Sequence, residues 1–274
     1  MQNLKLNNGV SIPEIGFGTW QIPDGETTAQ AVKTALEYGY THIDTAACYQ
    51  NEIGVGRAIR ESGVPREKLF VTTKLWNTER GYDSALRAFA ASLQKLQLEY
   101  LDLYLIHWPD NKNPALNTAS WQALEKLYQE GLIKALGVSN FKPRHLQPLL
   151  DTAEIKPAVN QIEYHPGFRQ EETVEFCQKH HILVEAWSPL GSGRILQNPD
   201  LQRIAQKYNK STAQLCLRWC RQNGTLPLPK SITPERIKEN AQALDFEISA
   251  EDMQRINALP QFGWSGSDPD KMDF

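Results

Sequence analysis

Cysteine is scarce in this 274-residue sequence, and its distribution indicates neither a disulfide framework nor a metal site. The cysteines are Cys48, Cys177, Cys216 and Cys220. The spacing of Cys216 and Cys220 would place both on one helix face, but no further Cys or His completes a set of metal ligands. We therefore interpret the cysteines as buried structural thiols, expect no bound metal, and expect a cytoplasmic location because the cytoplasm is reducing.

Long apolar runs and an excess of basic residues are also absent. No segment approaches the roughly 18 uninterrupted apolar residues of a transmembrane helix, and the first residues lack the apolar stretch of a signal peptide. The net charge of −3 and the pI of about 6.1 give no global basic field, so nucleic acid is not an expected partner. Without a linker, a low-complexity segment or a repeat, the chain is predicted to form one domain, residues 1–274.

Strand-like and helix-like segments alternate along the chain. Predicted strands cover residues 15–19, 41–43, 69–74, 101–106, 133–138, 158–163, 182–187 and 226–229. Predicted helices cover residues 26–38, 52–61, 83–97, 120–129, 143–152, 171–180, 201–222 (broken near 209–211), 234–244 and 250–259. Before them, Asn8-Gly9 predicts a β-hairpin that closes one end of a barrel. Eight strand-helix units in this order predict parallel strands with right-handed crossovers.

The polar residues that follow the strands favour a closed (β/α)8 barrel over an open doubly wound sheet. They are Asp44, Lys74, His107, Ser139-Asn140, Gln161, Ser188 and Lys230-Ser231. In a closed barrel all of these positions lie at the same mouth, formed by the carboxyl ends of the strands. Barrels of this kind carry out their chemistry at that mouth.

Four of the residues expected at the mouth suggest a phenol that acts as a general acid. Reduction of a carbonyl by hydride transfer leaves an alkoxide that must be protonated, and Tyr49 is the candidate donor. A free tyrosine has a pKa of about 10, which the Lys74 ammonium would lower. Asp44 would hold Lys74 and keep it charged, and His107 would donate to the carbonyl oxygen or orient it. Lys74 as a Schiff-base nucleophile is disfavoured, because that role needs a neutral amine.

The chain resembles the aldo-keto reductase family in a set of motifs that occur in the same order. They are Ile43-Asp44-Thr45-Ala46 with Tyr49-Gln50-Asn51-Glu52, Thr73-Lys74-Leu75-Trp76, Ile106-His107-Trp108-Pro109, Gly137-Val138-Ser139-Asn140-Phe141, Asn160-Gln161-Ile162-Glu163, and Pro229-Lys230-Ser231 with Arg236-Ile237-Lys238-Glu239-Asn240. The short segment 109–118 is similar to that of compact microbial members that reduce 2,5-diketogluconate or methylglyoxal.

The resemblance implies a (β/α)8 TIM barrel with an N-terminal hairpin plug and a C-terminal tail over the active site. It implies NADPH-dependent reduction of aldehydes and ketones to alcohols. Tyr49 would be the acid, with Lys74, Asp44 and His107 in support. A small-molecule carbonyl would be the substrate, and family precedent favours a monomer.

The resemblance also implies where NADP(H) binds, although the dinucleotide-binding turn is missing. Gly16-Phe17-Gly18 is followed by Pro23 rather than by a helix. Ser139, Asn140 and Gln161 would bind the carboxamide, and Trp187 would stack on the nicotinamide. The loop Ser188-Pro189-Leu190-Gly191 would wrap the pyrophosphate. Lys230, Ser231 and Arg236 would bind the 2′-phosphate, and Glu239 and Asn240 the adenine. Gly18, Thr19, Trp20 and Asp44 complete the predicted set.

Aromatic side chains after the first, third, fourth and fifth strands predict an apolar wall around the substrate. They are Trp20, Trp76, Trp108 and Phe141, together with Tyr49 and His107. Trp264 and the tail 267–274 are expected to fold over this pocket. Related microbial tails carry Arg-x-Gly-Pro-Asp-Pro, whereas this tail lacks the arginine, which argues against anionic substrates. Cys48, beside Tyr49, is an oxidation site only if its thiol is accessible.

Two other classes of function share some of these features. One is a nucleotide-binding regulatory subunit built on the same barrel, similar to the potassium-channel β-subunits. Such a protein would bind the cofactor without physiological turnover. The complete set of four catalytic candidates argues against it. A metal-dependent hydrolase would need several ligands at the strand ends, and His107 is the one well-placed histidine.

Overall fold

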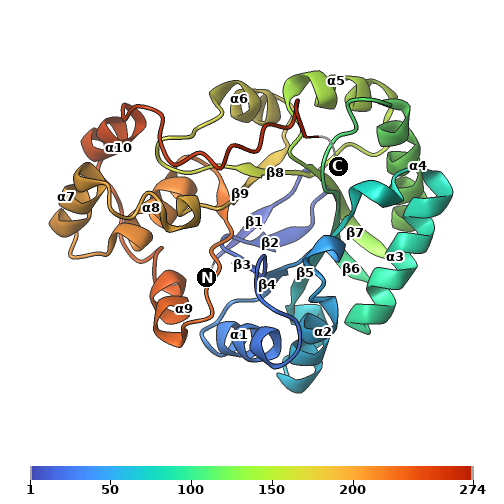
Figure 1. Cartoon of the computed structure of the whole chain (residues 1–274), viewed down its shortest axis with the longest axis horizontal. Coiled ribbons are helices and arrows are strands. Elements are labelled where there is room, and N and C mark those ends of the chain that lie inside the picture. The colour runs from blue at the N-terminus through green and yellow to red at the C-terminus, as the bar shows by residue number, and fades with distance from the viewer. Residues whose placement is uncertain (1, 273–274) are drawn as a thin grey trace.

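Eight parallel strands form the centre of the molecule, in the order in which they occur along the chain (Figure 1). The structure, a computed structural model, describes residues 2–272. The strands are β3 (Phe17–Gly18), β4 (His42–Asp44), β5 (Phe70–Leu75), β6 (Leu101–Ile106), β7 (Ile133–Ser139), β8 (Val159–Glu163), β9 (Leu183–Trp187) and β10 (Leu226–Pro227). Hydrogen bonds from Gly16 N–H to Pro227 O (3.1 Å) and from Gly18 N–H to Pro229 O (3.0 Å) connect the first strand to the last. The predicted (β/α)8 barrel is confirmed.

Sequence explains why the strands can be buried on both faces. β6 is apolar at five of its six positions, and all six are buried.

The barrel closes where the first strand meets the last. This point needs a residue without a side chain, because a Cβ on Gly16 would lie 2.6 Å from both His42 Nδ1 and a methyl of Leu228. Glycine therefore allows the first and last strands to approach each other.

The helices surround the barrel and agree closely with the sequence-based prediction. They are α1 (Glu26–Glu37), α2 (Glu52–Glu61), α3 (Tyr82–Leu96), α4 (Ala115–Gln129), α5 (Pro143–Thr152), α6 (Glu171–Lys179), α7 (Pro199–Lys207), α8 (Thr212–Gln222), α9 (Pro234–Ala241) and α10 (Ala250–Asn257). The break expected near residues 209–211 is present. There Ser211 Oγ accepts from Gln214 N–H and the Gln214 side chain accepts from Ser211 N–H, both at 3.2 Å, which caps α8.

One helix begins earlier than predicted. α4 starts at Ala115 rather than at residue 120, so part of the segment after β6 is helical. No side chain caps this end of the helix, so the sequence carries no cap signal. Instead, the Asn117 amide holds the backbone of Asp110 through hydrogen bonds of 2.8 and 3.1 Å.

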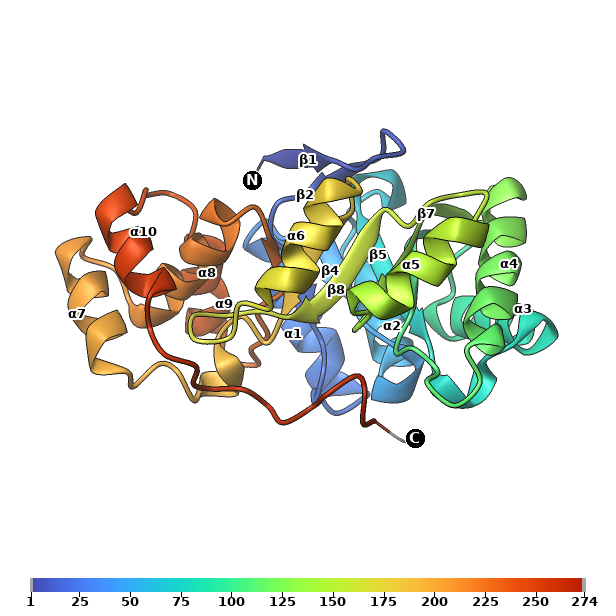
Figure 2. The ribbon, with the colours of Figure 1, turned by 90° about the horizontal axis from the view of Figure 1, so that it is seen from above.

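The N-terminal hairpin and the C-terminal tail lie at opposite ends of the barrel (Figure 2). The hairpin consists of β1 (Asn3–Lys5) and β2 (Ser11–Pro13), joined through a turn in which Gly9 has a φ of +85°. Its side chains Leu6 and Ile12 pack beneath the strands in a buried apolar cluster that we call the floor: Leu6, Ile12, Phe70, Leu103, Leu105, Ala135, Ala158, Val159, Leu226 and Leu228. The tail crosses the other end, which we call the mouth.

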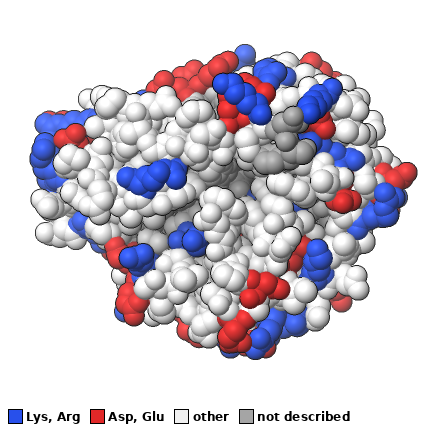
Figure 3. All heavy atoms as spheres, in the orientation of Figure 1, with Lys and Arg blue, Asp and Glu red and all other residues white. Residues whose placement is uncertain are grey.

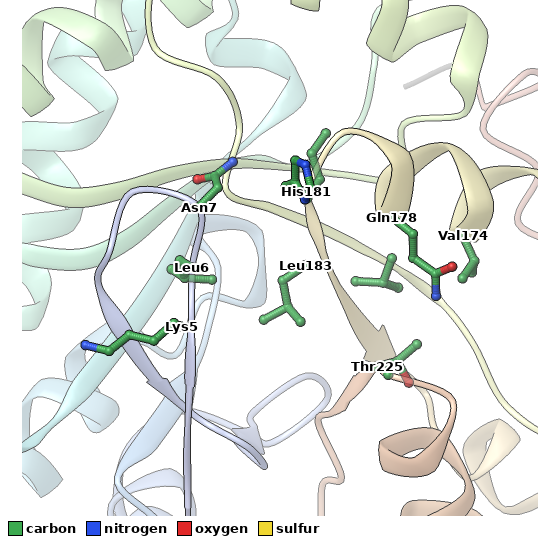
Figure 4. Close-up of a pocket in the computed structure, with 11 residues that line it drawn as sticks. Lys5, Leu6, Asn7, Val174, Gln178, His181, Leu183 and Thr225 are labelled. Atoms are coloured by element: carbon green, nitrogen blue, oxygen red, sulfur yellow. The ribbon is translucent and has the colours of Figure 1, made fainter.

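A pocket of about 430 Å³ lies beside the floor, between the hairpin, α6 and β9 (Figure 4). Asn7, Gln178, His181 and Thr225 are among its lining residues. A smaller pocket of about 170 Å³ lies at the mouth, beside Trp187 and Trp264. We place the functional site at the mouth despite the smaller volume, because the polar strand ends meet there. No helix within residues 2–272 is long and apolar enough to cross a membrane.

Candidate active site

A buried lysine with three fixed hydrogen bonds is the centre of the site. Lys74 lies on β5, and its side chain has no exposed surface. Its Nζ donates to Asp44 Oδ1 (2.7 Å), to the Thr45 carbonyl oxygen (2.9 Å) and to Tyr49 Oη (3.3 Å). Because an ammonium has three hydrogens, all of its donors are used. The sequence prediction that Asp44, Lys74 and Tyr49 converge agrees with this geometry.

The ion pair keeps Lys74 charged. Burial lowers the pKa of the Lys74 ammonium, but the charges of Asp44 and Tyr49 and their hydrogen bonds outweigh burial, so the net shift is upward. A charged amine is not a nucleophile, which excludes Schiff-base chemistry at this position. Since both partners are buried, removing either one would leave an uncompensated charge.

Tyr49 follows β4 on a short 3-10 helix, η1 (Ala47–Tyr49), and remains protonated at neutral pH. Burial raises the pKa of the phenol and Lys74 lowers it, with a net rise to about 12. Lys74 thus lowers the Tyr49 pKa as expected, but burial outweighs it, so the net pKa lies above the ordinary tyrosine value rather than below it. The sequence shows the cation but not the burial that opposes it. A protonated phenol is nevertheless the form that a proton donor requires.

His107 follows β6 and lies beside Tyr49. The two rings meet edge to face with centroids 5.7 Å apart, and Trp76 also packs edge to face against the imidazole, with centroids 5.2 Å apart. Burial, followed by the charges of Lys74 and Arg80, lowers the His107 pKa well below its usual value, so the ring is neutral.

Cys48 lies next to this ring, with its Sγ 3.5 Å from His107 Nδ1, and burial raises the pKa of the Cys48 thiol to about 11. Cys48 is thus a thiol hydrogen-bond partner of His107 rather than a reactive thiolate.

The polar groups after β7 and on β8 form a connected network with Trp187. Asn140 Nδ2 donates to the His107 carbonyl oxygen and to Ser139 Oγ, both at 3.0 Å, and its Oδ1 accepts from Trp187 Nε1 at 2.8 Å. Gln161 Nε2 donates to Asp44 Oδ2 and to Glu185 Oε2, both at 2.8 Å. The hydrogen bond to Asn140 fixes the plane of the Trp187 indole. Both hydrogens of Gln161 Nε2 are used, so the Gln161 side chain can bind a further group only through its carbonyl oxygen, as an acceptor.

Backbone strain marks the same region. Asn140 has a φ of +65° and Ser188 a φ of +47°, and each directly follows a barrel strand. Non-glycine residues adopt this conformation infrequently, and such residues cluster at functional sites. After Ser188, the loop continues through buried Pro189 to Gly191, where the 3-10 helix η4 (Gly191–Gly193) begins.

Exposed cations lie near the start of α9. Lys230 and Arg236 are both exposed, and within residues 2–272 neither forms an ion pair with a carboxylate. Between them, Ser231 Oγ accepts from Thr233 N–H at 3.1 Å. Figure 3 shows the mouth hollowed near its centre, with basic side chains on the side of α9. Unpaired cations beside a helix N-terminus suit an anionic group. Glu239 is half-buried and Asn240 buried on the same helix.

The aromatic residues predicted as a substrate wall differ in position. Trp20 is 45% exposed, Trp76 is half-buried and Trp108 is 8% exposed. Phe141 has no exposed surface and packs in the core against His145, with centroids 5.9 Å apart. Phe141 is therefore a core residue, and its predicted place in the substrate wall is wrong. Asn160 holds the Phe141 backbone on both sides of the residue, through its N–H and its carbonyl oxygen, which sequence spacing does not reveal.

The C-terminal tail is attached to the mouth by polar contacts. Lys142 Nζ binds Asp268 (2.7 Å) and Asp270 (2.8 Å), and Arg144 binds Asp270 (2.5 Å). Ser265 Oγ donates to Glu163 Oε2 at 2.6 Å, and the Trp264 ring stacks on Phe168. The tail therefore covers part of the mouth as expected. Residues 273–274 lie outside the described part of the chain.

Two buried residues of the network were missed by sequence reasoning. Glu185 lies on β9 and His42 on β4, and neither has exposed surface. The signal for Glu185 was a lone charged residue inside the apolar segment Leu183–Trp187. His42 directly precedes the Ile43-Asp44 motif and was interpreted only as part of a strand.

Comparisons with known proteins agree with this geometry. The model of the Aldo/keto reductase family matches residues 14–261. Glyoxal reductase of Bacillus subtilis (strain 168) is 52% identical over 271 residues, covering 99% of this chain and 97% of the relative. Methylglyoxal reductase DkgA of Yersinia pestis is 45% identical over 269 residues, covering 97% and 96%. A mutant of Gox0644 in complex with NADPH has a TM-score of 0.94 and 41% identity, covering 100% and 99% of the two chains.

Proposed function

The chain belongs to the aldo-keto reductase family, and on that premise we propose that it reduces small uncharged dicarbonyl compounds with NADPH, using Tyr49 as the proton donor. It is an NADP(H)-dependent oxidoreductase that acts on aldehydes and ketones. The observation that carries the catalytic assignment is the hydrogen bond from buried, charged Lys74 to Tyr49 Oη.

The proton donor is prepared by its neighbours. Lys74 donates to Tyr49 Oη, so the phenolic hydrogen points elsewhere and is available to the substrate oxygen. As a carbonyl becomes an alkoxide, negative charge develops near Tyr49 and is stabilised by the Lys74 ammonium. Asp44 holds Lys74 in place and acts through it.

His107 supplies a second contact to the substrate oxygen. The ring is neutral, so one nitrogen carries a hydrogen and the other accepts. Cys48 Sγ lies 3.5 Å from Nδ1. We assign the thiol as the donor in this contact, which leaves the hydrogen of the neutral ring on Nε2. Nε2–H then donates to the carbonyl oxygen and polarises it.

The residues of the mouth fit NADP(H), which supplies the hydride. The Gln161 carbonyl oxygen would accept from the carboxamide N–H, because both Nε2 hydrogens are already used, and Ser139 and Asn140 would bind the same group. Trp187, held by Asn140, offers its ring for stacking. The loop Ser188-Pro189-Leu190-Gly191 would contact the pyrophosphate, and Gly18, Thr19 and Trp20 would complete the cofactor site. Lys230, Ser231 and Arg236 would bind the 2′-phosphate, and Glu239 and Asn240 would bind the adenine.

The substrate class follows from the charges at the mouth. Cations close to the tail are neutralised: Lys142 and Arg144 by Asp268 and Asp270, and Arg80 by Asp110 at 3.0 Å. An anionic substrate would have to displace these carboxylates. Trp20, Trp76 and Trp108 offer apolar surface instead. A small neutral dicarbonyl fits this environment, as the names of the glyoxal and methylglyoxal reductases among the relatives suggest.

A carbonyl panel tests the proposal. NADPH oxidation is followed with glyoxal, methylglyoxal, benzaldehyde and 2,5-diketogluconate. We expect kcat/KM for the neutral dicarbonyls to exceed that for the anionic sugar acid by about tenfold or more, which corresponds to roughly 1.4 kcal/mol. Preference for the anion would contradict the substrate class. Tight NADPH binding without any turnover would instead indicate a regulatory subunit.

We also propose that the protein acts as a one-domain monomer in a reducing compartment. Within residues 2–272 the exposed large apolar side chains are Trp20, Tyr38, Ile53, Tyr82, Ile232 and Trp264. Two of them, Trp20 and Trp264, lie at the mouth, where substrate would cover them, and singly exposed apolar side chains are normal. The cysteines are free, and Cys177, Cys216 and Cys220 are buried. Light scattering after size-exclusion chromatography tests the proposed stoichiometry, and a dimer mass would contradict it.

A further inference from the structure

Glu185 is a buried carboxyl without a cation beside it. It projects from β9 into the barrel and has no exposed surface. Its Oε2 accepts from Gln161 Nε2 at 2.8 Å, from the neighbouring strand β8. Its Oε1 has no hydrogen-bond partner among residues 2–272, and the nearest basic nitrogen to it is His42 Nε2 at 3.9 Å.

His42 does not supply the missing charge. Its ring is fully buried, packs edge to face on Phe70 with centroids 4.9 Å apart, and has Nε2 3.1 Å from Thr72 Oγ1. Burial and then the nearby Lys74 lower its pKa to about 3, so the ring is neutral at physiological pH. A neutral imidazole cannot compensate a carboxylate.

The other groups around Glu185 do not form an ion pair with it among residues 2–272. From β5, Lys74 has its three hydrogens committed to Asp44, Thr45 and Tyr49. From β4, Asp44 adds negative charge. The cross-strand partners of Glu185, Gln161 on β8 and Leu226 on β10, are uncharged. An ionised Glu185 would therefore be a buried charge next to Asp44, compensated only in part by the charge of Lys74 and the Gln161 hydrogen bond, which is costly. Burial, followed by the charge of Asp44, raises its pKa to about 8.

Gln161 connects this carboxyl to the catalytic residues. One amide hydrogen binds Glu185 Oε2 and the other binds Asp44 Oδ2. The second oxygen of Asp44 accepts from Lys74, which donates to Tyr49. With both hydrogens anchored, the Gln161 amide cannot turn without breaking two buried hydrogen bonds.

We propose that Glu185 is a positioning residue for carbonyl reduction: in its acid form it holds the Gln161 amide against Asp44, and its ionisation makes Tyr49 a weaker proton donor. This role rests on the proposed function, because Glu185 would act through the same Lys74 and Tyr49. An added negative charge next to the Asp44–Lys74 pair opposes the effect of the ammonium on the phenol. Glu185 itself exchanges no proton with the substrate.

A pH profile of the Glu185→Gln variant tests this role. Glutamine keeps an acceptor for Gln161 Nε2 and stays neutral at every pH. In the wild type we expect kcat for reduction to fall as pH rises through the Glu185 pKa of about 8. In the variant we expect a neutral-pH rate within about threefold of wild type, and an alkaline fall that moves up by about one pH unit or more.

Glu125→Gln is the matched control. Glu125 is also a buried carboxyl, 7% exposed, but it lies on α4 and accepts from Ile155 N–H outside the barrel. This control should keep the wild-type pH profile. An unchanged alkaline fall in Glu185→Gln would overturn the proposal. So would a loss of about a hundredfold in its neutral-pH rate, since a neutral acceptor would then be insufficient.

Infrared spectroscopy of the wild type tests the acid form without any variant having to fold. A protonated carboxylic acid band should be present at pH 7 and disappear as the pH rises past the Glu185 pKa of about 8. The absence of such a band at pH 7 would overturn the proposal. Loss of turnover in Tyr49→Phe together with an unchanged Glu185→Gln profile would refute this role alone. No turnover in the wild type would refute the proposed function, and the infrared result would still decide the protonation of Glu185.

Discussion

The mouth and the floor of the barrel are built from the same strands but differ in chemistry. On β4 and β5, the residues toward the mouth include Asp44 and Lys74, whereas Phe70 at the start of β5 packs in the floor. At the mouth, buried polar groups are held by charge-assisted hydrogen bonds. At the floor, Leu6 and Ile12 from the hairpin fill the interior with apolar contacts. The mouth is thus the polar end, where we propose that the reaction takes place, and the floor is an apolar end whose burial contributes to stability.

Lys74→Met should have the largest effect on activity. It removes the cation that prepares Tyr49 and leaves Asp44 buried without its partner. We expect kcat to fall by about a thousandfold and the free energy of unfolding to fall by about 3–5 kcal/mol. Kinetics and denaturant unfolding measure the two losses separately.

The double variant Lys74→Met with Asp44→Asn is the control for that experiment. Removing both charges should restore much of the stability but none of the activity, because the unpaired carboxylate is gone while the proton donor remains unprepared. Substantial activity in either variant would contradict the role given to Lys74.

Lys230→Ala combined with Arg236→Ala should alter cofactor choice at the mouth without altering the chemistry. Two charge-assisted contacts to the 2′-phosphate would be lost, so the KM for NADPH should rise by about a hundredfold, and that for NADH by less than about threefold. Lys238→Ala, an exposed cation on the same helix α9, is the matched control and should leave both values unchanged. Equal effects on both cofactors would place the 2′-phosphate elsewhere.

Ile12→Ala should damage the floor and spare the mouth. Ile12 is fully buried in the apolar cluster, so truncation leaves a cavity and should cost about 2–5 kcal/mol of unfolding free energy. kcat and KM, measured where the variant remains folded, should stay within about twofold of wild type. Val10→Ala, in the same hairpin but only half-buried, should cost less. A large change in kcat would show that the two ends are coupled.

The buried His42 should make the stability of the folded protein depend on pH. Its pKa is about 3 in the folded protein, below its ordinary value of 6.5, so the unfolded chain binds the extra proton between these values. Stability should therefore fall as pH drops from 6.5, by at most about 1.4 kcal/mol per pH unit from this group. His42→Gln should flatten the slope of thermal stability between pH 4 and 6.5. An unchanged slope would mean that other groups dominate acid unfolding.

Much of this architecture could be predicted from the sequence, because its signals are local. Apolar runs between turn residues located the strands, and the polar residue after each strand located the mouth. The early start of α4 was missed because no capping side chain marks it. The burial of Phe141, the role of Glu185 and the rise in the Tyr49 pKa depend on contacts between distant strands, which spacing along one chain does not encode. The ion pairs of the tail likewise join residues more than 120 positions apart.

The measurement that tests the central claim most directly is the turnover of Tyr49→Phe with methylglyoxal, alongside NADPH binding followed by tryptophan fluorescence. Tyr104→Phe is the matched control, since the Tyr104 hydroxyl is buried in the core and has no hydrogen-bond partner among residues 2–272. We expect Tyr49→Phe to bind NADPH within about threefold of wild type but to lose about a thousandfold in activity, while Tyr104→Phe keeps its activity. If Tyr49→Phe retained more than about a tenth of the activity, Tyr49 would not be the proton donor.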